Sequence, residues 1–438
     1  MKKKSWWLVK ILSPIAVAGG CLSIIPFTTS CSFMYHDLKH IAPYLHEIVY
    51  DDYREDVKYE TIDDSEAFGC SSVRLGNYYG RNFDYVYNDT PEFVVRVKAN
   101  KQLHRHESIA IATHFGLREK KLLNGQYHKQ LELVPNLTMD GINDAGVICS
   151  SNVVSMEPNK EVLTAETKPG EGKKKLHALF IPRYVLDNAS SAEDAVNKLT
   201  NDVNIFGNLK KEMNLHIMIA DKTKTYVVEF FKKKDSNHNH FDVVAEEKSD
   251  NWNNPTSIMT NHYLNTDQAT FTNEEKFGNE RLELLKKHYP QTQDQYNNFG
   301  FDDMVALMRN VQFSKAYRIH TDPSEKATSQ IPMGKTGYDL ELSEWYSEKV
   351  KQKDIATWEE SKTPSQQSDF WQDLFVGFDQ LKEDFAEKVR EEANPSYWIT
   401  THNTTYHWDW EKNEGLLSVI VQEQYEHHYD YHIKINAN

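Results

Sequence analysis

Cysteine is scarce in this sequence, with 4 residues among 438. Cys21 and Cys31 lie close to the N-terminus, so only Cys70 and Cys149 remain for the rest of the chain. Two cysteines do not make a disulfide framework for an exported domain of this size, although a single bridge between them is left open. Cys149 lies in an apolar run and is expected in the core, because unpaired cysteine is readily buried.

The sequence is also poor in positive charge. Its net charge is -15, and no long basic run follows the first ten residues. A nucleic-acid partner is therefore not expected, because neutralising phosphates requires a positive surface. The histidines occur in small groups, such as His104 with His106 and His427 with His428. These groups do not have the spacing of a zinc site, so neither a metal nor another cofactor is expected.

The N-terminus, by contrast, is basic and then apolar. Lysines at positions 2–4 precede an apolar stretch over 11–27, and small residues then lead to Cys31. This order resembles the signal segment of a bacterial lipoprotein, which predicts export and attachment to a membrane. Cys21 is a second candidate for the lipidated residue, and an uncleaved transmembrane anchor is the alternative interpretation. No later apolar run reaches the ~18 residues that a spanning helix needs.

Along the rest of the chain, strand patterns come first, helix patterns lie mostly between strand groups, and strand patterns return at the end. Two apolar runs on either side of Gly76 and Asn77 predict a β-hairpin. Between Leu38 and Ile48, apolar residues at helical spacing predict a partly helical segment. Further strands are expected at 93–97, 108–113, 147–154, 216–220, 226–231, 397–410 and 416–424, and helices at 177–186, 191–199, 279–287 and 302–310. This order favours a layered α+β fold over a series of βαβ units.

Cys70 stands at the start of the predicted hairpin, and Arg81 and Asp84 follow in its second strand. A thiolate is a strong nucleophile, but a free cysteine is mostly protonated at neutral pH and needs a base. If the peptide bond before Cys70 were cut, its own α-amine, with a reference pKa of about 8, could act as that base. The arginine would then favour the thiolate, and the aspartate would orient the amine. A buried structural cysteine with a surface Arg81–Asp84 pair is the alternative.

The motif GCSSV…GRNFDY around Cys70 resembles the start of the choloylglycine hydrolase and penicillin V acylase family of N-terminal-nucleophile hydrolases. Five further motifs resemble that family in the same order: DGINDAGVICSSNVV, LHIMIADKTKTYVVEF, SIMTNHY, NERLELL and THNTTYHWDWEKN. The likeness covers about 70–283 and again about 397–424. It implies a four-layer αββα sandwich and the hydrolysis of a linear, non-peptide amide C–N bond through a thioester.

The resemblance also implies roles for single residues. The catalytic residues it points to are Cys70, Arg81, Asp84, Asn152, Asn261 and Arg281. Asn261 would donate its side-chain amide to the oxyanion, and Asn152 would complete that hole through its backbone N–H. Arg281 would act electrostatically on the surroundings of the nucleophile. The substrate would be a small acyl amide, such as a conjugated bile acid, penicillin V or another N-acyl amide, and the enzyme could be a homo-oligomer.

The chain departs from the family pattern in what precedes Cys70. It must lose 69 residues to expose this cysteine, so residues 1–31 are expected to be the signal segment and 32–69 a propeptide. A lipid on Cys31 would leave with that propeptide unless the propeptide stays bound. Residues 70–438 would form the hydrolase domain, with a helical, solvent-facing insertion at about 320–395.

Two other functions fit parts of the sequence. A non-catalytic surface lipoprotein that binds a ligand would keep the fold and leave the bond between Gly69 and Cys70 intact. A conventional cysteine–histidine enzyme would need no processing and would use a histidine such as His262, next to Asn261, as its base. The groups around the Cys70 sulfur distinguish these possibilities.

Overall fold

The computed structural model describes residues 35–53, 69–86, 90–114, 117–125, 130–154, 166–168, 171–207, 214–232, 240–264, 278–312, 398–421 and 427–436. The chain divides into two compact units, Met1–Phe33 and Met34–Asn438, and every described residue belongs to the second. The expected signal segment and the expected insertion at about 320–395 therefore lie outside the described residues. Within the described ranges, every helix is too short or too polar to cross a membrane.

A nine-stranded sheet contains most of the strands, in the order β1-β2-β5-β6-β7-β8-β11-β12-β13. Neighbouring strands are antiparallel except for β2 and β5, which are parallel. The strands are β1 Tyr35–Ala42, β2 Leu45–Tyr50, β5 Glu92–Val97, β6 Ser108–Thr113, β7 Thr138–Asn143, β8 Ile148–Val154, β11 Asn214–Ala220, β12 Thr225–Lys232 and β13 Phe241–Lys248.

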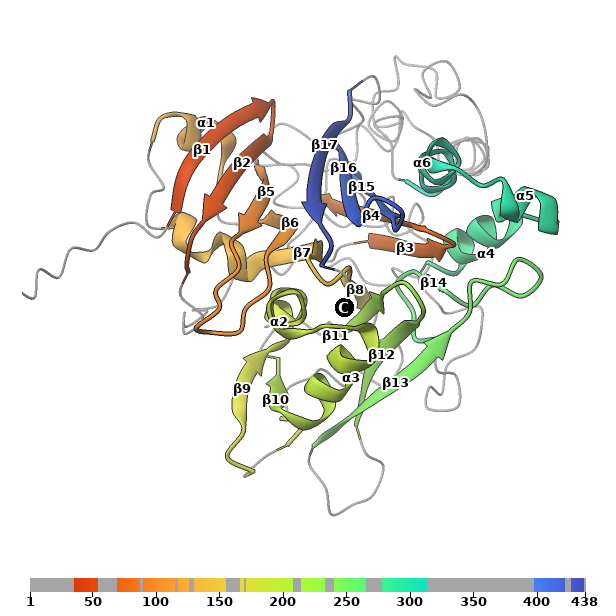
Figure 1. Cartoon of the computed structure of the whole chain (residues 1–438), viewed down its shortest axis with the longest axis horizontal. Coiled ribbons are helices and arrows are strands. Elements are labelled where there is room, and N and C mark those ends of the chain that lie inside the picture. The colour runs from red at the N-terminus through yellow and green to blue at the C-terminus, as the bar shows by residue number, and fades with distance from the viewer. Residues whose placement is uncertain are drawn as a thin grey trace, which may run out of the picture. The chain divides into compact units, whose positions relative to one another are not determined.

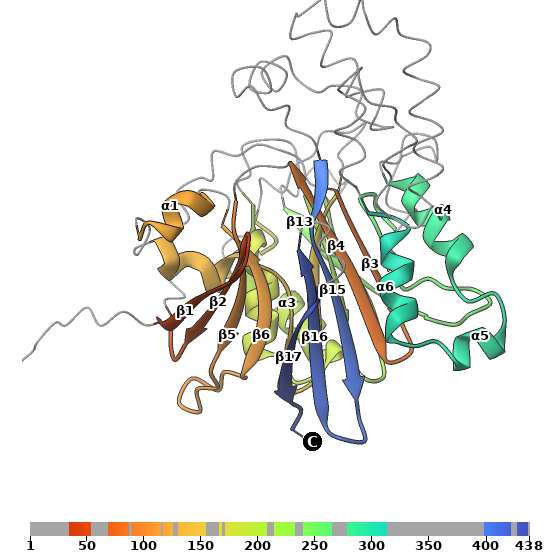
Figure 2. The same cartoon turned by 90° about the horizontal axis from the view of Figure 1, so that it is seen from above.

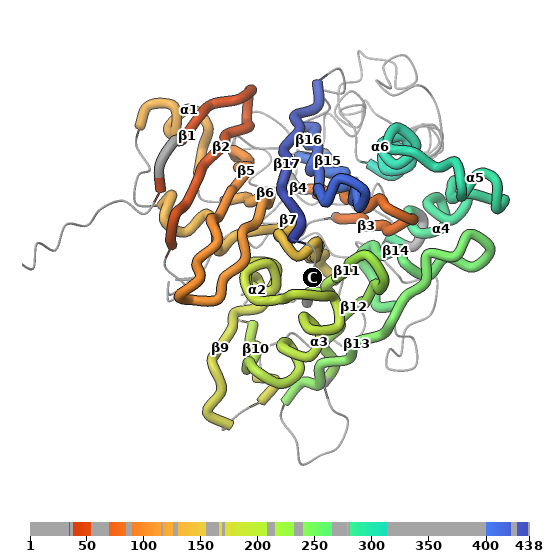
Figure 3. Tube along the Cα trace, in the orientation of Figure 1, coloured from red at the N-terminus to blue at the C-terminus, as the bar shows by residue number. Residues whose placement is uncertain are grey.

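A six-stranded antiparallel sheet has the order β14-β3-β4-β15-β16-β17. The strands are β14 Ile258–Met259, β3 Gly69–Leu75, β4 Tyr78–Val86, β15 Trp398–Asp409, β16 Glu414–Val421 and β17 Tyr429–Lys434. Figure 3 shows β15, the first of the three strands at the C-terminal end of the chain, beside β4. A separate parallel pair is formed by β9 Lys174–His177 and β10 Val203–Phe206.

The two sheets stack face to face, and helices cover their outer faces (Figures 1 and 2). On the nine-stranded sheet, α2 packs against β7 and β8, and α3 packs against β11, β12 and β13. On the six-stranded sheet, α6 packs against β4 and β15. The helices are α1 Glu119–Leu123, α2 Ile181–Asn188, α3 Ala192–Asn201, α4 Asn279–His288, α5 Gln293–Asn297 and α6 Phe301–Arg309, and the 3₁₀ helices are η1 Gln130–Leu137 and η2 Ala178–Phe180.

Glycine lets the helices approach the sheets closely at two points. A Cβ on Gly141 of β7 would lie 2.5 Å from the Leu186 side chain of α2. A Cβ on Gly80 of β4 would lie 2.5 Å from the Met308 side chain of α6. Both layers of helices therefore rest on strands that lack a side chain at the contact. The α+β class and the αββα layering expected from the sequence are confirmed.

The helix expected between Leu38 and Ile48 is wrong. This segment forms the β1–β2 hairpin, and Tyr44 occupies the turn with a φ of 66°. β2 lies inside the sheet between β1 and β5, and five of its six residues are buried. A strand covered on both faces does not alternate between apolar and polar residues, so its apolar spacing is easily mistaken for that of a helix. The expected propeptide thus contributes two strands to the larger sheet.

Candidate functional site

Cys70 lies near the start of β3 and is paired with Phe83 across the β3–β4 hairpin. Its side chain is only 1% exposed. Cys149, on β8 of the other sheet, is also buried, and both thiols are free. The single bridge that the sequence left open is therefore absent between these two cysteines, while the expectation that Cys149 belongs to the core is confirmed.

Arg81 comes from β4 and reaches the Cys70 sulfur. Its Nη2 lies 3.7 Å from Sγ and donates to the carbonyl oxygen of Ser151 at 2.7 Å. Its Nη1 donates to Oδ2 of Asp140 at 2.7 Å, and both side chains of this ion pair are 0% exposed. The guanidinium is therefore fixed beside the thiol by a carboxylate and a main-chain carbonyl of the other sheet.

A buried polar network lies behind Arg81, and sequence reasoning assigned no role to its members. Asp140 Oδ1 accepts from Thr404 Oγ1 at 3.0 Å and from the Tyr406 hydroxyl, and Oδ2 lies 3.3 Å from His402 Nε2. The other ring nitrogen of His402 lies 3.3 Å from a carboxylate oxygen of Glu92. Burial lowers the pKa of His402, but Glu92 and Asp140 outweigh it and the pKa is raised. Asp140 lies in the DGINDAG motif, and His402, Thr404 and Tyr406 lie in the THNTTYHWDWEKN motif, whereas Glu92 lies in none of the motifs.

Asp84 and Arg281 form a second buried ion pair, which contacts the backbone of Cys70. Arg281 Nη1 donates to Asp84 Oδ2 at 2.8 Å and to the carbonyl oxygen of Cys70 at 3.3 Å. Thr400 Oγ1 donates to the other carboxylate oxygen of Asp84 at 2.6 Å. Asp84, Arg81 and Arg281 are all 0% exposed, so the surface Arg81–Asp84 pair considered as an alternative is not what the structure contains.

Asn261 follows β14 and holds the nitrogen of Cys70. The Cys70 N–H donates to Asn261 Oδ1 at 2.9 Å, and Arg281 Nη2 donates to the same oxygen. Asn261 Nδ2 donates to the carbonyl oxygen of Val153 at 2.7 Å. The side-chain amide is thereby oriented at the bond that joins Gly69 to Cys70.

Unlike that of Asn261, the side chain of Asn152 makes hydrogen bonds to other residues and not to Cys70. Its Nδ2 donates to the carbonyl oxygens of Met259 and Thr260 at 3.3 and 3.2 Å, and its Oδ1 accepts from Ser72 Oγ at 3.2 Å. The Asn152 side chain therefore fixes the backbone at residues 259–260, directly before Asn261. Any part in an oxyanion hole is left to its main-chain N–H, as the resemblance implied.

The groups around Cys70 act on its thiol in opposite directions. Burial raises the pKa of Cys70 to about 11, although Arg81 and Arg281 lower it. Burial likewise raises the pKa of Asp84 to about 6, against the lowering effect of Arg281 and Thr400. The uncut chain therefore holds Cys70 as a neutral thiol at neutral pH.

This thiol should react slowly with alkylating reagents. In the uncut chain at pH 8, we expect iodoacetamide to modify Cys70 at least about 100-fold more slowly than in about 8 M urea, because only the thiolate reacts and the side chain is buried. Peptide mapping by mass spectrometry at timed intervals measures this, with Cys149 as a buried internal comparison. Equal rates in native and unfolded protein would contradict the described environment.

Histidine is not among the hydrogen-bonding or charged partners of Cys70 in the described part of the chain. These groups are Asn261, Arg81, Arg281 and the backbone of Asp84. His262 is turned instead towards Thr260, whose Oγ1 lies 3.2 Å from its Nδ1. The geometry disfavours the cysteine–histidine alternative and gives no base to Cys70 in the uncut chain.

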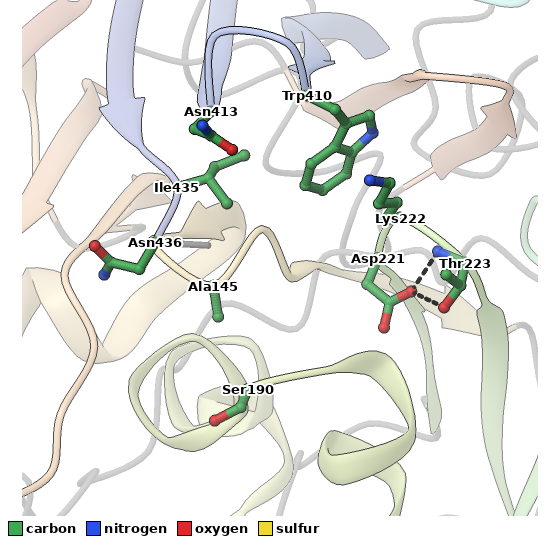
Figure 4. A pocket seen from close by; sticks show the side chains of 9 residues that line it. All are labelled: Ala145, Ser190, Asp221, Lys222, Thr223, Trp410, Asn413, Ile435 and Asn436. Carbon is green, nitrogen blue, oxygen red and sulfur yellow. Dashed lines mark hydrogen bonds between the residues drawn. The ribbon is translucent and has the colours of Figure 1, made fainter. Parts of the chain in front are cut away.

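A pocket of about 270 Å³ lies elsewhere, among the turns that end β7, β11 and β15 (Figure 4). Lys222 Nζ stands 5.0 Å from the centroid of the Trp410 ring at its rim. Arg74, at the far end of β3 from Cys70, donates to the carbonyl oxygen of Lys222 at 3.2 Å. The pocket contains none of the six expected catalytic residues, so it is separate from the cysteine site.

The αββα sandwich, with a cysteine near the start of one central strand and two buried arginine–carboxylate pairs around it, defines the class of protein: an acyl-amide-cleaving enzyme of the N-terminal-nucleophile type. The sequence matches the family model described as acyl-coenzyme A:6-aminopenicillanic acid acyl-transferase over residues 73–328. This match spans more than half of the chain, which therefore belongs to that family. It includes the other five expected catalytic residues and begins three residues after Cys70.

The chain was also compared with curated proteins and with solved structures, and these comparisons say less about its family. No curated protein matches the chain. Among solved structures, a mutant of the conjugated bile acid hydrolase from Clostridium perfringens is similar, with 14% sequence identity and a TM-score of 0.35. The likeness covers 84% of this chain and 97% of the bile acid hydrolase.

Proposed function

We propose that this enzyme hydrolyses a linear, non-peptide amide C–N bond, with Cys70 as nucleophile after cleavage of the chain between Gly69 and Cys70. One observation carries the proposal. The sulfur and the nitrogen of Cys70 are held in one buried site, the sulfur by Arg81 at 3.7 Å and the nitrogen by Asn261 at 2.9 Å. Any buried backbone N–H needs an acceptor, but here a side-chain amide meets the nitrogen while an arginine reaches the sulfur of the same residue. Both groups that a residue acting as nucleophile and base must supply are therefore positioned together.

Cleavage of the chain would use the same atoms. The Cys70 sulfur attacks the carbonyl carbon of Gly69, the C–N bond breaks, and the thiol proton passes to the departing nitrogen. This gives a thioester and a free α-amine on Cys70, and water then hydrolyses the thioester to a carboxylate on Gly69. Arg281 donates to the carbonyl oxygen of Cys70 and would keep the residue in place during cleavage.

In the mature enzyme the α-amine of Cys70 would take the thiol proton and Asp84 would help to orient it. Sγ attacks the acyl carbon of the substrate, and the developing oxyanion is stabilised by Asn261 Nδ2 and the main-chain N–H of Asn152. The substrate C–N bond breaks as the α-ammonium gives its proton to the leaving amine. Water then attacks the thioester, with the amine as base, and releases the acid.

The proposed substrate class rests on the resemblance of the motifs to the choloylglycine hydrolase and penicillin V acylase family. Small acyl amides such as conjugated bile acids, penicillin V and other N-acyl amides are the proposed substrates. We also propose that the enzyme is exported, is attached to a membrane through its N-terminal segment, and assembles as a homo-oligomer.

Intact-mass analysis and N-terminal sequencing of the exported protein test the cleavage. The expected mature chain starts at Cys70, and the same preparation should hydrolyse at least one member of a panel of acyl amides. Active protein with an intact bond between Gly69 and Cys70 would refute the mechanism. Uncleaved and inactive protein would favour a ligand-binding surface lipoprotein that keeps the fold.

Asn261→Ala should slow turnover by about 100-fold, because it removes one oxyanion donor and the acceptor for the Cys70 nitrogen. Steady-state kinetics on the best amide of the panel measure kcat. Asn403→Ala is the matched control, since Asn403 is also buried and its amide donates to Asn82 on β4. An unchanged kcat in Asn261→Ala would exclude the proposed role.

A further inference from the structure

Three side chains converge at the N-terminal edge of the nine-stranded sheet, well apart in sequence from the cysteine site. His40 of β1, His46 of β2 and Glu119 of α1 present ligand atoms that all lie within 4.8 Å of one another. His46 Nε2 lies 2.7 Å from Glu119 Oε2, and His40 Nε2 lies 3.4 Å from Glu119 Oε1. Both rings therefore direct Nε2 at the same carboxylate.

The β1–β2 hairpin creates this convergence. His40 and His46 are opposite each other in the antiparallel register, and their ring centroids are 5.1 Å apart. The turn residue Tyr44 donates its N–H to Glu119 Oε1 at 3.2 Å, and its carbonyl oxygen accepts from the N–H of Glu92 at 2.8 Å. The backbone thus holds the carboxylate against the hairpin, and the hairpin against β5.

The three side chains differ in burial, with His46 the most buried and His40 the most exposed. His46 is 2% exposed and packs against Phe93 at a ring-centroid distance of 5.6 Å. Glu119 is almost as buried, whereas the side chain of His40 is 45% exposed. An ion could therefore enter from the His40 side and meet two preformed ligands beneath it.

We propose that His40, His46 and Glu119 bind a divalent transition-metal ion of the Zn²⁺ type. Two imidazole nitrogens and one carboxylate are a ligand set that Zn²⁺ accepts, with water in the fourth position. Mg²⁺ and Ca²⁺ prefer sites made of oxygen ligands, so they fit less well. In a tetrahedral site with ligands at about 2.1 Å, neighbouring ligand atoms are about 3.4 Å apart. The present spacing requires only small rotations of the side chains.

The site would also join two parts of the chain. His40 and His46 precede the bond between Gly69 and Cys70, and Glu119 follows it. A bound ion would cross-link the two pieces if the chain is cleaved there, and this consequence alone rests on the proposed function. Ion binding itself does not require cleavage.

Binding can be measured on the full-length Cys70→Ala chain, which stays in one piece under the proposed mechanism. Zn²⁺ is titrated against a chromogenic chelator, and Co²⁺ is used as a spectroscopic probe that separates imidazole from thiolate ligands. We expect His40→Ala and Glu119→Gln to weaken Zn²⁺ binding by at least about 100-fold, since even loss of an outer partner costs about 10- to 100-fold. His40→Ala is the decisive variant, because the His40 side chain is 45% exposed and its loss should leave the fold intact.

His432→Ala is the matched control. His432 is an exposed histidine that lies 3.2 Å from a single carboxylate, Glu414, and its replacement should leave Zn²⁺ affinity unchanged. Zn²⁺ should also raise the melting temperature of the parent chain but not that of His40→Ala, because a ligand that binds only the folded state stabilises it. Equal Zn²⁺ affinity in the parent, His40→Ala and Glu119→Gln chains would overturn the proposal and leave a hydrogen-bonded cluster only.

The proposed cross-link between the two pieces of a cleaved chain is tested by a separate measurement. In processed protein, Zn²⁺ should raise the urea concentration at which the N-terminal piece separates, and His40→Ala should remove that shift. If the uncut chain binds Zn²⁺ but processed protein is never found, the proposed cleavage fails and the metal site stands.

Discussion

Cys70→Ala should abolish both the cleavage of the chain and the hydrolysis of every acyl amide, lowering turnover by at least about 10⁴-fold. The substitution removes the sulfur, which is the nucleophile that attacks the amide carbon in both proposed reactions. The folded structure should change little, because the backbone N–H of residue 70 can still donate to Asn261 and Arg281 can still contact the carbonyl oxygen. Intact mass reports the cleavage, and amide turnover reports the hydrolysis.

Cys149→Ala separates this effect from the general loss of a buried thiol. Cys149 is as buried as Cys70 but lies on the other sheet, and the variant should keep both cleavage and turnover. Residual hydrolysis by Cys70→Ala, above that of a mock preparation, would remove Cys70 from the mechanism. A Cys70→Ala chain that is still cut after Gly69 would show that another protease processes it.

Asp140→Asn should lower the free energy of unfolding by about 3–5 kcal/mol, because it leaves the buried Arg81 without its counter-charge. Asp140 and Arg81 are both 0% exposed, and their ion pair measures 2.7 Å. Chemical denaturation of the uncut Cys70→Ala chain, with and without Asp140→Asn, measures the difference. Asp409→Asn, which breaks an exposed pair with Lys412, should leave the free energy of unfolding nearly unchanged.

The pH dependence of this difference identifies its cause. Burial raises the pKa of Asp140, but Arg81 and His402 lower it more, so the native carboxylate titrates below its usual range. A lowered native pKa contributes stability that is fully present above the unfolded value of about 3.9 and is lost as the pH falls through the native value. The penalty of Asp140→Asn should therefore shrink below about pH 4. A penalty that is constant with pH would indicate lost packing and not lost charge.

The hairpin and most central strands were predictable from the sequence because their apolar runs are bounded by turn residues. The runs around Gly76 and Asn77 became β3 and β4, and the expected strand at 108–113 is β6. The hairpin also put Arg81 and Asp84 near Cys70, as its register required. The β1–β2 hairpin was missed because a strand covered on both faces carries no period-two pattern.

The electrostatics of the site were less accessible to sequence reasoning. Asn261 and Arg281 were found through resemblance alone, because their contacts with Cys70 span about 200 residues of chain. Asp140, His402 and Glu92 come from β7, β15 and β5. Nothing in their local patterns says that they meet behind Arg81, since that depends on the stacking of two sheets.

The place of β2 inside the larger sheet, between the edge strand β1 and β5, bears on how a lipidated enzyme would remain at its bilayer. Were Cys31 acylated and the chain severed after Gly69, the catalytic portion would share no covalent bond with its anchor. The ladder between β2 and β5, from Leu45 with Glu92 to Tyr50 with Val97, would then hold the two together. Mild denaturant should therefore release the catalytic portion from vesicles and leave the acylated N-terminal piece bound to them. A lipoprotein whose backbone is intact would stay bound as a whole.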